Sequence, residues 1–305
     1  MKDKKQQNNR LKKVLLLTGA TGYLGSSLLR VLVKSGCYKI IVLKRSFSNT
    51  FRINELLDKV TVYDIDTVKL EDVFKNNKID TVLHCATDYG RKNTSVLHII
   101  EANLILPVTL LELGENSGVR CFINTDTILD KRVSCYSLSK KQFKDWLLNQ
   151  KDKMVCVNIA LEHFFGPGDD KTKFVSFVVD SLLKKVESID FTKGEQKRDF
   201  IFIDDVTRAF MKIVEHSNSL KNGFYNFEIG TNKAVTIKEF ILLIKRLTKN
   251  KTTVLNFGAL PYRENEVMEG LANSETVRKL GWVDEYSLED GLMLMIEQEL
   301  QFINK

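Results

Sequence analysis

Apolar runs of four or five residues alternate with helical patterns through the first half of the chain. The runs are continuous, and we predict them to be strands: Val14–Leu17, Ile40–Leu43, Val60–Tyr63, Thr81–Cys85, Cys121–Asn124 and Val155–Ile159. The helical patterns between them cover Leu24–Lys34, Leu70–Asn76, Ser95–Gly114 and Ser137–Asn149. Continuous apolar strands joined by helices are typical of a parallel sheet covered on both faces. The pattern therefore predicts an α/β fold with a doubly wound parallel sheet, the Rossmann arrangement.

The regular alternation weakens after Gly166-Pro167-Gly168. Helical patterns return, separated by short strands, at Phe174–Val186, Asp205–His216, Ile237–Thr248 and Leu288–Leu300. We expect this half to form a smaller, mixed α/β lobe that closes over the first part.

Charge adds one feature to this picture. The net charge of the 305 residues is +7, but residues 1–13 alone hold six basic residues and one acidic residue. The rest of the chain is close to neutral, so we expect a basic, flexible arm over residues 1–12 and no nucleic-acid partner. The five scattered cysteines form no CxxC pair, so neither disulfides nor a metal site are expected.

No apolar stretch approaches the roughly 18 residues that cross a bilayer, so no membrane association is expected. The charged N-terminus is not followed by the apolar segment of a signal peptide. We therefore expect the protein to be cytoplasmic.

The most specific local pattern is a glycine triplet at positions 19, 22 and 25, directly between the first strand and the first helix. Such glycines permit a sharp turn, a close approach of backbone N–H groups to a pyrophosphate, and tight packing of the helix on the strand. The helix N-terminus then attracts the anion. A plain structural turn is the alternative, but this position in a βαβ unit favours dinucleotide binding. The residues predicted to bind the cofactor here are Gly19, Thr21, Gly22, Tyr23, Leu24 and Gly25.

Cofactor choice is expected at the end of the second strand. An acidic residue there would accept a hydrogen bond from the ribose 2′-OH of NAD. This chain instead has Lys44-Arg45-Ser46, two cations and a hydroxyl that suit a 2′-phosphate. The alternative is a solvated basic loop. We predict NADPH as the cofactor, with NAD less favoured.

A YxxxK spacing follows the fifth predicted strand, with Tyr136 and Lys140 on one face of a helix. An ammonium near a phenol favours the phenolate, so we expect Lys140 to lower the pKa of Tyr136 and ease proton exchange with a substrate oxygen. The spacing alone is common, and its position in the fold gives it weight.

Together these features resemble the extended short-chain dehydrogenase/reductase family, in its nucleotide-sugar branch of the NAD-dependent epimerase/dehydratase type. The resemblance covers nearly the whole chain. Besides the glycine triplet and YxxxK, it is carried by Val82–Thr87 (VLHCAT), Asn103, Phe165–Gly168 (FGPG) and Lys197–Val206 (KRDFIFIDDV).

The resemblance implies further roles. The catalytic residues would be Thr127, which polarises a substrate oxygen, with Tyr136 and Lys140; Thr125 is the fallback for Thr127. Lys140 would also bind the nicotinamide ribose, and Tyr136 lies beside it. Further cofactor contacts would come from Asp64, Ile65, Cys85, Ala86, Thr87 and Asn103. Substrate contacts would come from Asp88, Tyr89, Thr127, His163, Arg198 and Arg263.

Three reactions share this scaffold: reduction, epimerisation and dehydration. Dehydratases of the branch carry Thr-Asp-Glu, whereas Thr125-Asp126-Thr127 lacks the glutamate, so dehydration is not expected. Thr127 lies only nine positions before Tyr136. This short spacing resembles the deoxysugar 4-ketoreductases related to CDP-abequose and CDP-paratose synthases. We predict NADPH-dependent reduction of the 4-keto group of a nucleotide-linked deoxysugar for a surface polysaccharide.

Two alternatives remain. One is a nucleotide-sugar 4-epimerase that retains NAD, and the other is a cofactor-sensing or RNA-binding module without catalysis, against which the intact Thr, Tyr and Lys argue. The expected partner is a nucleoside diphosphate sugar. The helices at Ser95–Gly114 and Ser137–Asn149 match the pair that forms a homodimer interface in the family. The expected domains are a dinucleotide-binding domain at 13–165 and a substrate-binding lobe at 166–305, with some of the lobe's elements packing back on the first domain.

Overall fold

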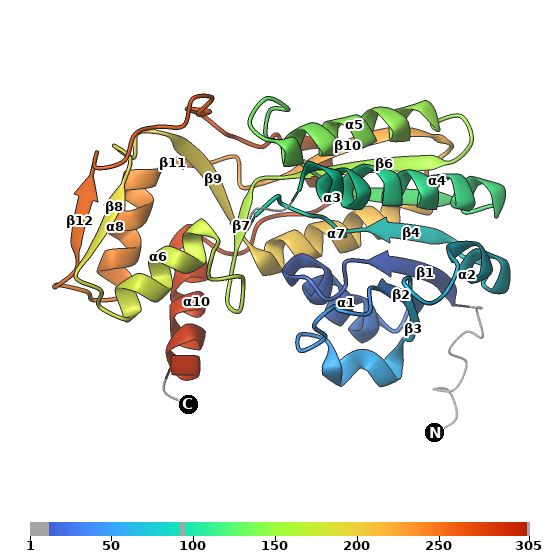
Figure 1. The fold of residues 1–305 in the computed structure, drawn as a ribbon, viewed down its shortest axis with the longest axis horizontal. Coiled ribbons are helices and arrows are strands. Elements are labelled where there is room, and N and C mark those ends of the chain that lie inside the picture. The colour runs from blue at the N-terminus through green and yellow to red at the C-terminus, as the bar shows by residue number, and fades with distance from the viewer. Residues whose placement is uncertain (1–11, 92–94, 304–305) are drawn as a thin grey trace, which may run out of the picture.

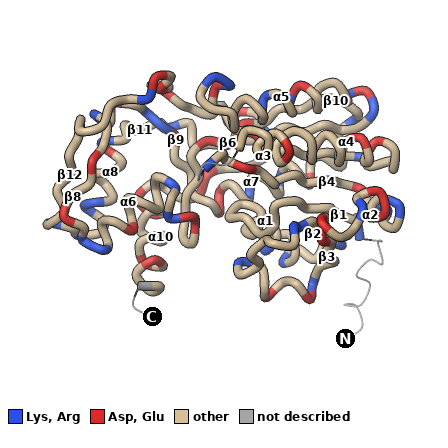
Figure 2. Tube along the Cα trace, viewed as in Figure 1, with Lys and Arg blue, Asp and Glu red and all other residues tan. Residues whose placement is uncertain are grey.

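The computed structural model describes residues 12–91 and 95–303, which form a large sheet domain and a smaller lobe beside it (Figure 1). The basic arm expected at residues 1–12 lies, except for Lys12, outside the described residues. Along the rest of the chain, Lys and Arg are interspersed with Asp and Glu over both parts (Figure 2).

The large sheet has seven parallel strands in the order β10-β6-β5-β4-β1-β2-β3. This order confirms the predicted doubly wound fold. Six strands match the predicted runs, and the seventh comes from the second half of the chain. Their bounds are β1 Lys13–Thr18, β2 Tyr38–Lys44, β3 Thr61–Asp64, β4 Thr81–His84, β5 Cys121–Thr127, β6 Val155–Leu161 and β10 Gly223–Ile229.

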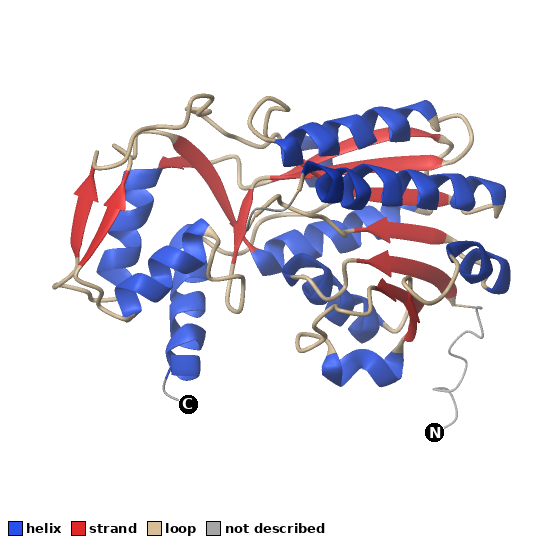
Figure 3. Cartoon of the chain, in the orientation of Figure 1, coloured by secondary structure: helices blue, strands red, loops and turns tan. Residues whose placement is uncertain are grey.

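Helices cover both faces of this sheet (Figure 3). The continuous apolar strands result from this arrangement, because successive side chains enter opposite cores: Leu15 and Leu17 lie in one core and Leu16 in the other. The first core is closed by α1 (Tyr23–Ser35) and α7 (Ile203–Ser217). The second is closed by α2 (Leu70–Asn76), α4 (Leu106–Asn116) and α5 (Cys135–Asn149).

A continuous helical segment precedes β5. It consists of α3 (Val96–Ile100), the π-helical turn η2 (Glu101–Ile105) and α4. By length and composition these 21 residues could cross a membrane, and only 28% of their most apolar window is buried. The expectation that no apolar stretch has this length was therefore wrong. The segment packs against α2 and α5, so its exposed apolar side is a face of the folded domain.

The smaller lobe combines two short sheets with helices, which confirms the predicted mixed α/β lobe. One sheet has the order β11-β9-β7, with β9 antiparallel to β11 and parallel to β7. The other pairs β12 with β8 in parallel. The bounds are β7 His163–Phe165, β8 Ser188–Phe191, β9 Lys197–Phe202, β11 Ala234–Thr236, β12 Val254–Phe257, α6 Phe174–Leu183, α8 Ile237–Leu247, α9 Glu275–Arg278 and α10 Leu288–Ile303. The large domain also contains a 3-10 helix, η1, at Asn54–Lys59.

Candidate active site

The strand order reverses between β1 and β4, the position at which doubly wound sheets bind their ligands. Gly19 follows β1 with a φ of +70°, and a Cβ there would lie 2.5 Å from the backbone nitrogen of Ala86, just after β4. A Cβ on Gly25 would overlap the carbonyl oxygen of Gly19. Both positions therefore require glycine, as the triplet predicted. Helix α1 begins after Gly22 without a side-chain cap, so its first N–H groups are available to an anion.

At the end of β2, two of the three predicted phosphate ligands are already bound to a carboxylate, which the sequence did not predict. Lys44 Nζ forms an ion pair with Asp64 Oδ2 at 3.2 Å, and Ser46 Oγ donates to the same oxygen at 2.9 Å. The backbone N–H of Ser46 donates to Asp66. Burial tends to raise the pKa of Asp64, but hydrogen bonds from the Asp66 backbone, Ser46 and Lys44 outweigh it and lower that pKa. Although Lys44-Arg45-Ser46 stands where an acidic residue would mark NAD, a carboxylate does lie beside these residues, because β3 brings its own end next to β2.

Arg45 is the second of the two cations at this site. Among the described residues it forms no ion pair, and its guanidinium lies 5.7 Å from the centroid of the Phe47 ring. The Phe47 side chain is itself largely exposed. Of the three predicted 2′-phosphate ligands, Arg45 alone thus keeps its charge unneutralised.

After β4, the predicted cofactor residue Thr87 and the predicted substrate residue Asp88 are held in place by the buried side-chain amide of Asn103. Asn103 Oδ1 accepts hydrogen bonds from Thr87 Oγ1 at 3.1 Å and from the Asp88 N–H at 2.8 Å. Its Nδ2 donates to the Asp88 carbonyl and to Ser139 Oγ on α5. Asn103 lies in the π-helical turn, which is the kind of local widening that often marks functional sites. The turn allows a helix residue to hold the loop after β4 against α5.

The three predicted catalytic residues come from the end of β5 and the first turns of α5. Thr127 is the last residue of β5, and Tyr136 and Lys140 lie one turn apart on α5, which starts from a capping box at Ser134. All three are buried or nearly so. The Thr127 hydroxyl lies close enough to the Tyr136 phenol to lower its pKa. The structure thus brings a hydroxyl and a phenol together at the carboxyl edge of the sheet.

The pKa of Tyr136 is raised well above its usual value, not lowered. Burial is the main cause, followed by the nearby Tyr89 and Asp126; the Thr127 hydroxyl lowers the pKa by less. Lys140 is not among the groups with the largest effect on the Tyr136 pKa. Its own pKa falls to about 8 because the ammonium is fully buried, an effect that the charge of Asp126 only partly offsets. The expectation that Lys140 lowers the Tyr136 pKa is therefore not met in this structure.

Asp126 was not predicted as a site residue, although a carboxylate within a strand of seven buried residues is unusual. Its Oδ2 accepts from Lys141 Nζ at 3.1 Å and from Asn158 Nδ2 at 3.0 Å, and its Oδ1 accepts from the Thr127 N–H at 2.7 Å. This network fixes the backbone that carries Thr127. Thr125, the fallback, instead donates its hydroxyl proton to the His84 carbonyl, which leaves Thr127 as the hydroxyl next to Tyr136.

His163 follows β6, whose last residue, Leu161, is in register with Thr127. Its Nδ1 lies 2.6 Å from Oε2 of Glu162, a buried carboxylate that was not predicted from the sequence. A Cβ on Gly270 would overlap Glu162 Oε1, so the loop before α9 packs directly on this pair. A polar residue directly after seven buried strand residues could have drawn attention to Glu162.

The two arginines predicted to hold a diphosphate are placed differently. Arg198 is buried, and its guanidinium pairs with Glu266 at 2.6 Å and donates to the Lys197 carbonyl. Arg263 is exposed on the same loop as Glu266, where the Arg263 carbonyl accepts from the Glu266 N–H. No described hydrogen bond or ion pair joins the two arginine side chains to one acceptor.

The acidic residues of the KRDFIFIDDV run brace neighbouring loops. Asp199 accepts from the N–H groups of Thr231 and Asn232. Asp205 accepts from the N–H groups of Glu285 and Tyr286 at 2.8 and 3.1 Å. In this chain the run therefore joins the lobe to the large domain.

The described residues fit a dinucleotide. The Gly19 and Gly25 contacts leave the turn after β1 close to the backbone after β4. The ammonium of Lys140 is buried and has no hydrogen-bond partner among the described residues. A buried ammonium needs acceptors, and the ribose hydroxyls of a dinucleotide would provide them.

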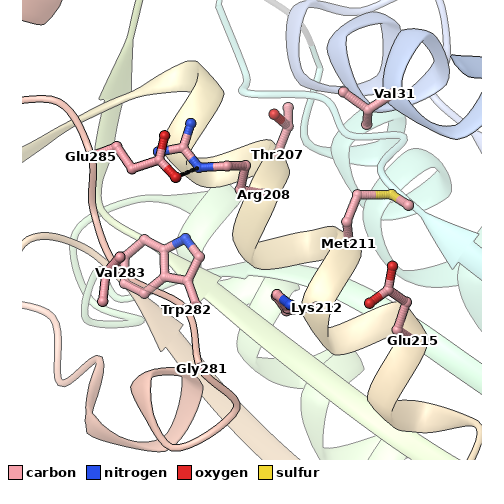
Figure 4. A pocket seen from close by; sticks show the side chains of 10 residues that line it. All are labelled: Val31, Thr207, Arg208, Met211, Lys212, Glu215, Gly281, Trp282, Val283 and Glu285. Carbon is pink, nitrogen blue, oxygen red and sulfur yellow. Dashed lines mark ion pairs between the residues drawn. The ribbon is translucent and has the colours of Figure 1, made fainter. Parts of the chain in front are cut away.

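A separate cavity of about 310 Å³ lies between α1, α7 and the segment before α10 (Figure 4). Its lining includes Met211, Trp282 and Arg208, which pairs with Glu285. The lining contains none of the predicted site residues, so this cavity is distinct from the candidate active site.

A comparison with known protein families shows to which family the chain belongs. The model of the NAD dependent epimerase/dehydratase family matches residues 15–230, which include the glycine triplet, the YxxxK pair and the KRDFIFIDDV run. The chain belongs to this family. As a family member it is an NAD(P)-binding enzyme, which confirms the predicted resemblance and the predicted enzyme class.

Individual members of the epimerase/dehydratase family extend the comparison. The chain is 35% identical to the CDP-abequose synthase of Salmonella muenchen over 94% of this chain and 98% of the relative. It is 30% identical to the CDP-abequose synthase of Salmonella typhimurium strain LT2 over 94% and 99%. UDP-glucuronic acid 4-epimerase from Bacillus cereus, solved with UDP-glucuronic acid and NAD, shares the fold with a TM-score of 0.80 at 21% identity, over 95% and 99% of the chains.

Proposed function

We propose that this protein reduces the 4-keto group of a nucleotide-linked deoxysugar, with NADPH as the hydride donor. The observation that carries the proposal is the near full-length similarity to two CDP-abequose synthases. The hydroxyl and phenol of Thr127 and Tyr136, which lie together at the carboxyl edge of β5, supply the chemical groups. A CDP-linked 4-keto-3,6-dideoxyhexose is the first substrate to test.

The chemistry assigned to the chain is proton transfer and orientation, because bound NADPH supplies the hydride. Thr127 Oγ1 polarises the substrate carbonyl, and Tyr136 donates its phenolic proton to the oxygen on which negative charge develops. The raised pKa of Tyr136 keeps the phenol protonated before the transfer. Lys140 holds the cofactor ribose and stabilises the phenolate that forms. Asp126, through the backbone of Thr127, positions the polarising hydroxyl.

For the cofactor, we infer a preference for NADPH that rests mainly on Arg45. Arg45 has no ion pair among the described residues and sits at the end of β2, where the adenosine ribose of a dinucleotide is expected. Lys44 and Ser46 are engaged with Asp64, and they would contribute only if a phosphate displaced that carboxylate.

The same contacts favour one alternative, a 4-epimerase that retains NAD. Asp64 is a carboxylate at the end of the neighbouring strand, and a carboxylate is the group that accepts a ribose 2′-OH. The fold-level neighbours include epimerases solved with NAD. An epimerase would interconvert two sugars without net oxidation of the cofactor, whereas a reductase consumes it.

We further propose that the protein is a cytoplasmic homodimer, with residues 13–165 for the cofactor and 166–305 for the substrate. Large apolar side chains are exposed on adjacent helices of one face: Val96, Leu97, Ile105, Leu138 and Trp146 are each between 42% and 69% exposed. Patches of this kind mark protein interfaces. A second copy would join two such faces in a four-helix contact.

The test is a set of assays with CDP-linked and other nucleotide-linked 4-keto-6-deoxy and 4-keto-3,6-dideoxy sugars. NADPH consumption would be followed by absorbance, and the product identified by NMR. The proposal expects stoichiometric oxidation of NADPH and a new secondary alcohol at C4. Interconversion of 4-epimers without net NADPH loss would establish the alternative instead.

A further inference from the structure

Five polar side chains form one row across the large sheet. Thr18, His84, Asn124, Asn158 and Asn226 are register partners on β1, β4, β5, β6 and β10. Register partners on parallel strands point to the same face of a sheet. The ring of His84 lies 6.0 Å from that of Phe143, so this face is the one covered by α5, the helix of Lys140. None of these five residues supplies a reacting group in the proposed reaction.

The hydrogen bonds at one end of the row fix the tautomer of His84. Thr18 Oγ1 accepts from the N–H groups of Cys85 and Ala86, so its single proton points to His84 Nδ1, 2.9 Å away. Burial, and then the positive charge of Lys140, lower the pKa of His84 well below its usual value. The imidazole is therefore neutral, and since Nδ1 accepts, Nε2 carries the proton.

The other end of the row is also bonded in one direction. Asn124 Nδ2 donates to Asn158 Oδ1 at 2.8 Å, and Asn158 Nδ2 donates to Asn226 Oδ1 at 2.9 Å. The amide oxygen of Asn124 therefore points away from β6, toward the strand of His84.

Six buried side-chain polar atoms have no hydrogen-bond partner among the described residues, and three of them belong to this region: His84 Nε2, Asn124 Oδ1 and Lys140 Nζ. The relative exposure of these residues is 0%, 0% and 1%. They are a donor, an acceptor and an ammonium beneath the same helix. Buried polar atoms of this kind are normally satisfied, and a water with two to four polar partners is the common solution.

We propose that an internal water molecule binds between His84, Asn124 and Lys140, and that through it His84 is a positioning residue for the Lys140 ammonium. The water oxygen accepts one hydrogen bond from His84 Nε2–H and one from Lys140 Nζ. One of its protons is donated to Asn124 Oδ1. The rings of Phe122 and Phe143 pack around His84 and close the site from this side.

The water affects the charge state of Lys140. The charged and titratable groups that face the ammonium are Asp126 on β5, Cys85 after β4 and Lys141 on α5. Asp126 favours the protonated form, and burial and Lys141 oppose it. Burial raises the pKa of the Cys85 thiol to about 12, so this group is neutral where Lys140 titrates. A water that accepts a hydrogen bond from the ammonium also favours the protonated form of Lys140. Without it, Lys140 loses its proton at lower pH.

The direct test is a crystal structure of the enzyme with its cofactor, for the unmodified protein and for His84→Leu. We expect one ordered water within hydrogen-bond distance of His84 Nε2, Asn124 Oδ1 and Lys140 Nζ in the unmodified protein, and its loss in His84→Leu. An ordered structure with no water there, or with His84 Nε2 bonded directly to Asn124 Oδ1, would overturn the proposal. This result does not depend on which substrate is reduced.

The kinetic test rests on the proposed function and uses the pH dependence of kcat/KM. In His84→Leu the limb at high pH should move down by about one pH unit, the effect of losing one hydrogen bond to a charged group. His84→Gln, whose amide reaches the position of Nε2, should restore the limb. Phe122→Leu disturbs the same core without a polar change, so it should lower Tm and leave the limb in place. Equal shifts of the limb at high pH in His84→Leu and Phe122→Leu would overturn the proposal.

If His84→Leu does not fold, Asn124→Val replaces it in both experiments, because it removes the acceptor of the same water. The crystal structure of the unmodified protein decides the question even if neither variant folds. Absence of turnover with every keto-sugar would count against the proposed function alone.

Discussion

The ring of Tyr136 packs against the ring of Tyr89, with centroids 5.0 Å apart. Tyr89 is in turn covered by the guanidinium of Arg91, at 5.3 Å, and by the ammonium of Lys173, at 5.6 Å. The phenol thus lies in an aromatic environment, and burial of the phenol, more than any single charge, raises its pKa. Tyr136 is protonated at neutral pH and suited to donate a proton to a substrate oxygen.

Tyr136→Phe should therefore abolish turnover and leave the fold and cofactor binding nearly intact. The ring keeps its packing against Tyr89, and only the transferable proton is lost, so kcat should fall by about 10³-fold. The measurement is steady-state reduction of the keto-sugar together with cofactor titration and Tm. Near-normal turnover would mean that the proton comes from another group.

Lys140→Met should remove activity and raise stability at neutral pH. The folded-state pKa of Lys140 is lowered from 10.5 to about 8 by burial, so the unfolded chain binds this proton more tightly and the charged form destabilises the fold below about pH 8. The stability of the unmodified protein should gain from this group as pH rises from about 8 to 10.5. The Tm of the variant should exceed that of the unmodified protein by a few degrees at pH 7, and less at pH 10. A Tm of Lys140→Met below that of the unmodified protein at pH 7 would contradict the expected destabilisation by the buried ammonium.

Arg45→Gln should weaken NADPH binding by about 10-fold and change NADH binding little, because one charge-assisted contact to the 2′-phosphate is lost. Lys44→Gln should have a smaller effect, since Lys44 is already paired with Asp64. Lys151→Gln, an exposed cation at the opposite end of the sheet, is the control for general charge. Equal losses for both cofactors would disprove the assignment of Arg45.

Leu97→Glu combined with Trp146→Glu should yield monomers if the exposed face of α3 and α5 is a homodimer interface. Burying a carboxylate in an apolar contact is strongly unfavourable. Light scattering and sedimentation would measure the mass. Leu242→Glu on α8, where the leucine is similarly exposed, is the control and should leave the assembly unchanged. If the unmodified protein is monomeric, the interface is absent.

Asp205→Ala should cost about 2–4 kcal/mol of unfolding free energy, because it removes the buried carboxylate that accepts from the N–H groups of Glu285 and Tyr286. Denaturant titration is the measurement. Asp204→Ala, the exposed neighbour, should cost little. A similar loss in both variants would show that the acidic pair acts through its charge and not through the contacts with residues 285 and 286.

The sequence predicted the parts of the fold and site that depend on local pattern. Buried strands, the glycine triplet at 19, 22 and 25, and the one-turn spacing of Tyr136 and Lys140 are all encoded within a few residues. The sequence did not reveal contacts between distant positions. Asp64 lies twenty residues after Lys44 and neutralises it, and Glu266 lies 68 residues after Arg198 and pairs with it. The direction of the Tyr136 pKa shift was also missed, since it depends on how deeply the pair is buried.

Strand β10 has a consequence for how the chain reaches its native state. It pairs with β6 along seven residues, but β7, α6, β8, β9 and α7 all lie between the two strands in the sequence. The large sheet therefore cannot be completed until about three quarters of the chain has left the ribosome, and a fragment that ends at residue 165 would expose the edge of β6 and the core face that α7 covers. We expect the proposed cofactor and substrate regions, although they would differ in role, to fold as one cooperative unit. Truncation between them should yield an aggregating fragment and not a soluble cofactor-binding module.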